Sequence, residues 1–390
     1  MSPLVTLTGD GTFRAPVPQH SGSPQPGSPQ PGSQQSGQLT AIEDPQLDAL
    51  MRLRGLLGDD LEDQIATRLY LPMALGTDAT DHLLPASLAM LSDESGDLAP
   101  YGWRIGTGLG RDWQRARDRI ATLADAARIA LLGYEGPLST AVLGPATLAA
   151  STFVGSGERT LSDPGAVRDL PMLLAEGLAD HLDLMAERVP GGRAELLVRE
   201  DAVGAVATGL IPTPSGRRTY PAIPATVIGT LWRCLLAELI DRDVLDPDRI
   251  TLGIGASRPL LQEARQAGFR RFAIAPHRLP ALSSAGGRDL WEEIAGAHDA
   301  GCRIEWVLDA RPGGALTAEL DQILRTWQQL GFGAAQAQGF TLIGHTGSSH
   351  ALHAGTTDPS EQPAYRALLD EAGLEHLLRA APLWAERVQS

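Results

Sequence analysis

Two amino acids are missing from this chain of 390 residues: lysine and asparagine. All 32 basic residues are therefore arginines. A Schiff-base enzyme needs a lysine amine, and a Walker-type phosphate loop needs a lysine beside its glycines. N-glycosylation needs an asparagine acceptor. The composition alone excludes these three kinds of site.

Cysteine is also scarce, because the chain has only Cys234 and Cys302. Each cysteine lies in an apolar stretch, "TLWRCLLAELI" and "CRIEWVLDA" respectively. We therefore expect both to be small buried residues. Two cysteines cannot build a disulfide framework or a cysteine-based zinc knuckle.

Long apolar runs and an excess of positive charge are absent as well. No apolar run approaches the ~20 residues that a helix needs to cross a bilayer. The first residues, "MSPLVTLTGDGTF", show no basic region followed by an apolar one, as a secretory signal would. The net charge of -15 disfavours a nucleic-acid partner, which requires a basic surface. We expect a cytoplasmic protein with neither a membrane nor a nucleic-acid partner.

A biased segment lies near the beginning of the chain. Residues 15–40 repeat the string Gly-Ser-Pro-Gln-Pro and are rich in Pro, Gly, Ser and Gln. These residues cannot bury enough apolar area to offset chain entropy. We therefore expect residues 1–40 to be a disordered tail and residues 41–390 to be one domain. A Pro-rich ligand for a partner's groove is the alternative interpretation of the tail.

Short apolar runs alternate with longer amphipathic segments over the rest of the chain. The runs are nearly continuous in apolar residues, as in parallel strands buried on both faces. Strands between helices indicate a parallel sheet, and their number favours an α/β fold of the (βα)8 TIM-like barrel type. The expected strands are 138–144, 194–199, 249–255, 270–276, 303–310 and 340–344, and the expected helices are 112–132, 162–189, 225–242, 257–267, 289–300, 316–330 and 362–387.

Polar residues follow several of these strands, where such barrels carry their chemistry. One strand ends in Arg199-Glu200-Asp201, which is either a display of functional groups or a loop whose arginine neutralises its carboxylates. Another ends in Asp309, with Arg311 two residues later. Asp309 is either a ligand for a substrate amine or the cap of the next helix.

The last expected strand leads into "LIGHTGSSHALH", which contains His345, His350 and His353. Histidines spaced by three or four residues occur in zinc sites. No carboxylate or cysteine lies nearby in sequence to complete such a set. We therefore predict no metal, and we interpret His350 and His353 as ordinary loop residues.

Several strings resemble a known family. They occur between residues 68 and 350, most clearly in 100–220. They are similar to the short actinobacterial relatives of cobalamin-independent methionine synthase, in the C-terminal, zinc-binding barrel of that enzyme. The strings are "YGWRI", "GRDWQRARD", "EGPLSTAVLGPATLAAS", "GERTLSDPGAVRDLPMLLAEGLADHL" and "GLIPTPSG".

The resemblance implies a barrel of the methionine synthase and uroporphyrinogen decarboxylase type, with zinc activating a thiol for methyl transfer. The zinc ligands of the family do not carry over. Gly253 and Gly255 stand where the family has His-x-Cys, and Thr346 stands at the position of the last cysteine. Of the family's Asp-Glu-Pro only Glu200 matches. We therefore expect no cofactor.

The sequence supports three hypotheses about function. The first is a methionine-synthase-like barrel that has lost its zinc site and binds a metabolite or a protein partner, as a candidate pseudoenzyme. The second is an enzyme with different acid/base chemistry, or a residual methyltransferase, in the same barrel mouth; the third is an interaction protein that works through its tail. The candidate residues are Glu200, Asp201 and His345 for catalysis and Trp103, Arg199, Asp309 and Thr346 for substrate binding, with no metal ligand.

Overall fold

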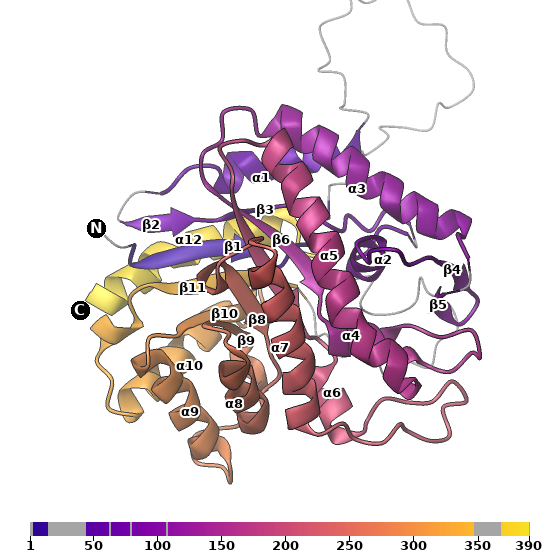
Figure 1. Cartoon of the computed structure of the whole chain (residues 1–390). Coiled ribbons are helices and arrows are strands. Elements are labelled where there is room, and N and C mark those ends of the chain that lie inside the picture. The colour runs from indigo at the N-terminus through magenta and orange to yellow at the C-terminus, as the bar shows by residue number, and fades with distance from the viewer. Residues whose placement is uncertain are drawn as a thin grey trace, which may run out of the picture.

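A ring of parallel strands enclosed by helices forms the body of the molecule (Figure 1). The computed structural model describes residues 3–14, 44–61, 64–78, 80–106, 108–346 and 368–389. All strand pairs within the ring are parallel. The strands follow one another around it in the order β2 (Ile65–Thr67), β1 (Val5–Gly9), β11 (Phe340–His345), β10 (Arg303–Asp309), β9 (Arg271–Ile274), β8 (Ile250–Gly253), β7 (Arg193–Arg199), β6 (Pro137–Leu143) and β3 (Leu69–Tyr70).

The two edge strands of this sheet are consecutive in the chain. Only Arg68 separates β2 from β3, and its backbone N–H donates to the carbonyl of Leu7 at 2.8 Å. Since β2 pairs with β1 and β3 pairs with β6, this short segment bridges the two edges. The result is a nearly closed, parallel, barrel-like sheet surrounded by helices, the arrangement of a TIM-type barrel.

The expected strands and helices from residue 111 to residue 345 are confirmed, with shifts at their ends. The last helix was expected over 362–387 and begins only at Glu371, while residues 362–367 lie outside the described part of the chain. Helix α5 illustrates why, because Asp163 caps it by accepting from the N–H groups of Gly165 and Ala166. No helix among the described residues is both long and apolar enough to cross a membrane. The helices are α1 (Pro45–Leu57), α2 (Leu83–Ala89), α3 (Arg111–Ala130), α4 (Pro145–Ser151), α5 (Pro164–Arg188), α6 (Val203–Thr208), α7 (Ala225–Asp241), α8 (Arg258–Ala267), α9 (Gly287–Asp299), α10 (Leu316–Gln329) and α12 (Glu371–Gln389), with 3-10 turns η1 (Thr160–Ser162), η2 (Pro247–Arg249), η3 (Pro276–Arg278) and η4 (Ala334–Ala337).

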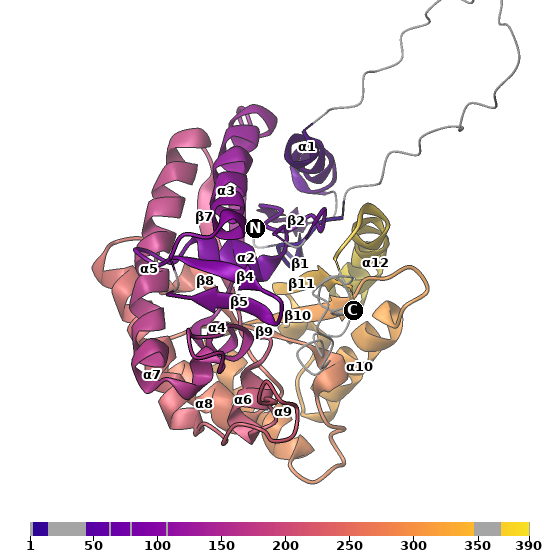
Figure 2. The same ribbon diagram turned by 90° about the vertical axis from the view of Figure 1, so that its right-hand side faces the viewer.

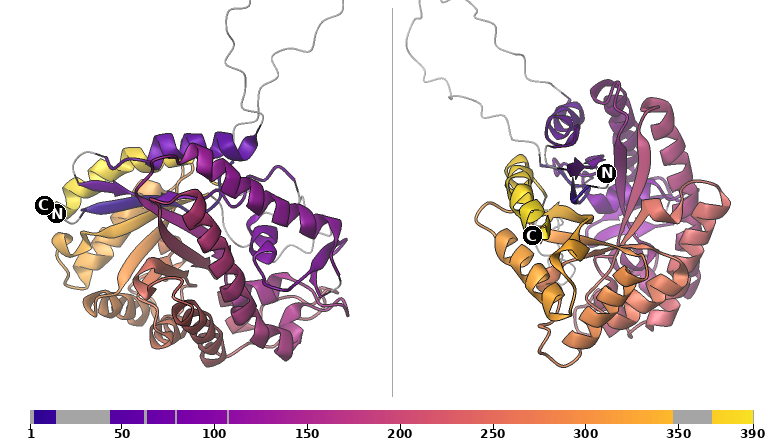
Figure 3. Two further views of the ribbon diagram at one scale, coloured as in Figure 1. Left: turned by 45° about the horizontal axis from the view of Figure 1, so that its top comes forward. Right: turned by 90° about the vertical axis from the view of Figure 1, so that its left-hand side faces the viewer.

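The N-terminal residues do not follow the expectation of a tail that reaches residue 40. Val5–Gly9 form β1, which lies between β2 and β11 in the ring. Val5 and Leu7 are fully buried, and helix α12 packs against β1 with α1 next to α12 (Figure 3). The strand is part of the barrel because Thr and apolar residues alternate in "VTLTG", which suits a strand with two different faces. Residues 15–43 lie outside the described part of the chain.

Cys234 also differs from its expected burial. Helix α7 buries Leu231, Trp232, Leu235 and Leu236, whereas Cys234 points to solvent between these positions. The apolar letters around it belong to the buried face, and the helical period places Cys234 off that face. Cys302 is partly buried, and both thiols are free.

Four charged side chains lie inside the barrel, toward the ends at which the strands begin. Arg68, Glu195, Arg271 and Glu305 come from different positions around the ring and form alternating ion pairs. Arg68 pairs with Glu195 and Glu305, both at 3.1 Å. Arg271 pairs with Glu195 at 2.8 Å and with Glu305 at 2.7 Å. We call these four residues the charge ring.

The charge ring is inside the barrel. Glu195, Arg271 and Glu305 each precede by two residues a side chain that lines the cavity at the barrel mouth. Alternate residues of a strand point to the same face, so the charge ring lies directly below that cavity. Burial alone raises the pKa of Glu305, but the guanidinium groups of Arg271 and Arg68 outweigh it and lower the pKa to about 2. Glu305 is therefore ionised throughout the neutral range.

We predict that Glu305→Leu lowers the free energy of unfolding by about 3–5 kcal/mol. The substitution leaves Arg68 and Arg271 to share Glu195 alone in a buried place. Urea denaturation measures the change. The matched control is Glu292→Gln on α9, where an exposed pair with Arg288 is removed and the change stays below ~1 kcal/mol. Equal stability of the two variants would contradict this role for the charge ring.

Candidate functional site

A small cavity lies where the strands end at the carboxyl side of the barrel. Figure 2 views the molecule from this side, where α4, α6 and the hairpin of β4 (Gly96–Ala99) and β5 (Gly102–Ile105) lie in front of the sheet. The cavity has a volume of about 60 Å³. Its charged and imidazole side chains are Asp10, Arg199, Glu200, Asp201, His277, Arg278 and His345. Chemistry in a TIM-type barrel is placed at this face.

A carboxylate and an imidazole meet in this cavity. His345, the last residue of β11, places its Nδ1 2.5 Å from Oδ2 of Asp10, which follows β1 directly. Asp10 is held in turn by Thr12, whose N–H donates at 3.0 Å and whose hydroxyl donates at 2.7 Å to Oδ1. Both members of the pair are buried. Because Nδ1 is engaged, Nε2 is the imidazole nitrogen left for a ligand.

Arg199 lies between two carboxylates at the end of β7. Its guanidinium is 3.2 Å from Asp10 Oδ2, 2.8 Å from Asp201 Oδ2, and also donates to the carbonyl of Asp10. Burial alone raises the pKa of Asp10, but Arg199 and the hydrogen bond with His345 lower it to about 2. Burial alone lowers the pKa of Arg199, but the charges of Asp201 and Asp10 outweigh it, and the pKa is raised overall. Both groups stay charged.

Glu200 does not share the chemistry of its neighbours. Its Oε1 accepts from the N–H of Ala146 at 3.1 Å and from Trp232 Nε1 at 2.8 Å. Its Oε2 accepts from the N–H of Thr147 at 2.8 Å and from the Thr147 hydroxyl at 2.7 Å. A Cβ at Gly144 would lie 2.5 Å from the Glu200 carboxyl carbon, so only glycine fits there. Glu200 lines the cavity, and burial raises its pKa against the effect of these hydrogen bonds. Its four donors hold the carboxylate at the start of α4.

Asp309 is close to the cavity but is neutralised locally. Its carboxylate receives Nε of Arg311 at 2.8 Å and Nη2 of Arg311 at 2.5 Å. These hydrogen bonds lower the pKa of Asp309, against the effect of burial. Neither residue lines the cavity. Asp309 thus pairs with Arg311 within its loop and does not cap the next helix, α10, whose N-cap residue is Ala315.

Two other candidate residues lie away from the cavity. Trp103 is a buried residue of β5 and packs edge to face on Trp113 of α3, with ring centroids 6.4 Å apart. Thr346 is buried directly after β11, and its hydroxyl has no hydrogen-bond partner within the described part of the chain. Both are absent from the cavity lining, so neither is placed to bind a ligand there. His350 and His353 lie outside the described residues.

The mouth does not offer a zinc ligand set at the positions that the family resemblance implies. Gly253 and Gly255 carry no donor side chain, and Nδ1 of His345 is engaged by Asp10. Within the described ranges, which leave out 15–43 and 347–367 among others, no group of three His, Cys, Asp or Glu side chains is arranged to hold a metal. Zinc sites need three or four such donors. The residues at hand therefore do not fit this metal.

Two functional candidates were missed in the sequence. Asp10 lies in the segment interpreted as a tail, although the alternation in "VTLTGD" followed by a Gly is a strand signal. Arg278 lies in η3, just after β9, and lines the cavity. The string "APHR" directly after an apolar run could have indicated it, because strand ends carry the chemistry in this fold.

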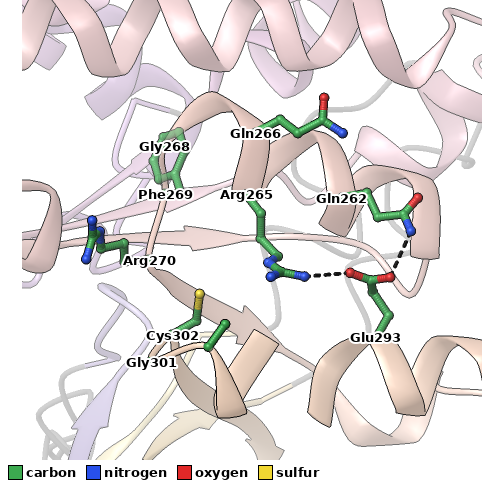
Figure 4. A pocket seen from close by; sticks show the side chains of 10 residues that line it. Gln262, Arg265, Gln266, Gly268, Phe269, Arg270, Glu293, Gly301 and Cys302 are labelled. Carbon is green, nitrogen blue, oxygen red and sulfur yellow. Dashed lines mark hydrogen bonds and ion pairs between the residues drawn. The ribbon is translucent and has the colours of Figure 1, made fainter. Parts of the chain in front are cut away.

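A larger hollow of about 710 Å³ lies at the opposite end of the strands (Figure 4). It is formed by α8, α9 and the turns that precede β9 and β10. Arg265 donates to Glu293 at 2.7 Å, and Gln262 donates to the same carboxylate at 2.8 Å. Arg265 and Glu293 neutralise each other, and no imidazole lines the hollow. The mouth cavity is the better candidate for chemistry.

Comparisons with known proteins add little to this geometry. No protein-family model matches the chain, and no curated protein matches it. Solved structures that match include the carboxyl transferase domain of Rhizobium etli pyruvate carboxylase. With 3-bromopyruvate it is 13% identical over 68% of this chain and 44% of that chain, at a TM-score of 0.26. With oxalate it is 12% identical over 97% and 56%, also at 0.26.

The chain spans about half the length, or less, of these two structures. Their TM-scores are too low for the likeness to bear on the fold or on the function. The description of the barrel rests instead on its strand pairing and the lining of its cavity.

We predict that Glu200→Gln destabilises the protein by about 1–3 kcal/mol. The amide NH₂ cannot accept from the donors that now face both carboxylate oxygens, so at least one buried donor loses its partner. Thermal and urea unfolding measure the loss. Glu375→Gln on the exposed side of α12 is the control and leaves the stability within ~0.5 kcal/mol. A stable Glu200→Gln variant would refute the structural assignment.

Proposed function

We propose that this barrel is an enzyme that uses His345 as a general acid or base on a small molecule bound at its mouth. The observation that carries the proposal is the buried pair of Asp10 and His345, with the imidazole lining a cavity at the carboxyl ends of the strands. A positioned imidazole is the side chain most used for proton transfer in enzymes. The proposal corresponds to the acid/base hypothesis of the sequence analysis, with Asp10 beside His345 in place of Glu200 and Asp201, which accept from other residues of the barrel.

The proton chemistry follows from the donor and acceptor roles. Asp10 remains a carboxylate because its pKa is lowered to about 2, so it accepts the Nδ1–H of His345. This fixes the tautomer in which Nε2 has a free lone pair. When Nε2 takes a proton from a ligand, the neighbouring carboxylate stabilises the imidazolium. Arg199 keeps Asp10 charged and in place.

A methionine-synthase-like barrel without its zinc ligands remains the second candidate function. In that role the mouth binds a metabolite, or the surface a protein partner, without turnover. Gly253 in the cavity lining, where the family has a zinc-binding side chain, supports this candidate. The two candidates differ in whether His345 moves a proton or merely contacts a ligand.

We predict that the protein catalyses proton exchange on a small ligand and that His345→Gln lowers the rate by about 10²–10⁴-fold. The protein is incubated in deuterated water with a panel of small oxo and hydroxy compounds, which are followed by proton NMR. Gln keeps a hydrogen-bonding side chain but cannot carry the proton.

The matched control is His376→Gln on α12. Its imidazole contacts the backbone carbonyls of Ala310 and Arg311 and does not line the cavity. This variant is expected to keep the wild-type rate. A ligand that binds the wild-type protein without any exchange or conversion would refute the acid/base proposal and favour the binding-only candidate.

A further inference from the structure

One cationic side chain in the mouth cavity has no anion of its own. Arg278 ends η3 and lines the cavity together with Arg199 and Asp201. Its Nε is buried without a hydrogen-bond partner, and no ion pair is formed by its guanidinium among the described residues. Arg199, by contrast, is shared by two carboxylates. The two arginines therefore differ in what they leave for a ligand.

The carboxylates near Arg278 are already engaged. Asp201 receives two guanidinium nitrogens of Arg199, at 2.8 and 3.4 Å. Asp10 is held by Arg199, Thr12 and His345. Burial lowers the pKa of Arg278, attraction by Asp201 opposes this, and the positive charge of Arg199 adds to it. A half-buried guanidinium in this position gains most from an anion that arrives through the cavity.

The size of the cavity limits that anion. A bound water needs roughly 10–15 Å³ of such volume, so the part of a ligand that lies inside a cavity of about 60 Å³ has about four to six non-hydrogen atoms. The start of α4, where backbone N–H groups could serve a phosphate, is occupied by the carboxylate of Glu200. A planar carboxylate matches the fork of one guanidinium and needs no further donors.

We infer that the ligand of the mouth cavity is a small monocarboxylate whose carboxylate pairs with Arg278. This inference rests on the proposed acid/base function of the same cavity, because it places the remaining atoms of the ligand beside Nε2 of His345. Arg278 is then the residue that selects acids over neutral compounds. Asp10 and Asp201, which also line the cavity, repel a second carboxylate.

Titration calorimetry with acetate, propionate, acetamide and inorganic phosphate tests the inference on the full chain. Acetate and propionate are expected to bind the wild-type protein at least about 10-fold more tightly than acetamide or phosphate. Arg278→Gln is expected to weaken acetate binding by about 10–100-fold, and Arg278→Lys, which keeps the charge, by less. Arg311→Gln, outside the cavity lining, is the control and leaves acetate binding unchanged.

The outcomes separate this inference from the acid/base proposal. If acetate binds His345→Gln as well as the wild type while Arg278→Gln loses it, the inference stands even where no proton exchange is found. If neutral compounds undergo exchange and no carboxylate binds, the inference fails and the acid/base proposal stands. Equal acetate binding by folded Arg278→Gln and wild type, or tighter binding of phosphate than of acetate, would overturn it.

Discussion

The charge ring inside the barrel is the constraint on which the rest of the molecule depends. Arg68, Glu195, Arg271 and Glu305 link the segment that joins the two sheet edges to three strands of the ring. Each charge has partners of opposite sign on two sides, so none is buried alone. Removing one leaves an uncompensated charge in the lumen, which is far costlier than losing an exposed pair. The interior of the barrel below the mouth cavity is therefore filled by paired charged side chains.

The interior of the barrel is divided into layers with different tasks. In the charge ring each arginine pairs with both glutamates, so every charge already has its partners. Above it, Leu197, Val307 and Ile343 form an apolar floor of the mouth cavity. Among the described residues that line the cavity, Arg278 forms no ion pair and His345 keeps its Nε2, while His277 contacts Glu319 through Nδ1 at 3.2 Å. Arginines and carboxylates thus stabilise the barrel in the charge ring, and in the mouth cavity the same residue types surround the proposed site.

Much of the barrel was predictable from the sequence, and the site much less so. Strands such as 193–199 and 303–309 are visible because burial on both faces selects short, nearly continuous apolar runs. The helix start at Asp163 follows from local capping chemistry. The role of Glu200 was not predictable in this way, because its partners Thr147 and Trp232 are distant in sequence. Its position at a strand end suggested chemistry, whereas its hydrogen bonds make it structural.

The sequence by itself determined the alternation of strands and helices, and it excluded lysine-dependent chemistry. Those properties depend on local periodicity and on composition. Only the tertiary structure decided which polar groups meet at the mouth. Asp10 and His345 are 335 residues apart and become neighbours because β1 pairs with β11 as the ring closes. Within the described part of the chain Arg278 has no ion-pair partner, because Asp10 and Asp201 pair with Arg199 at the end of β7.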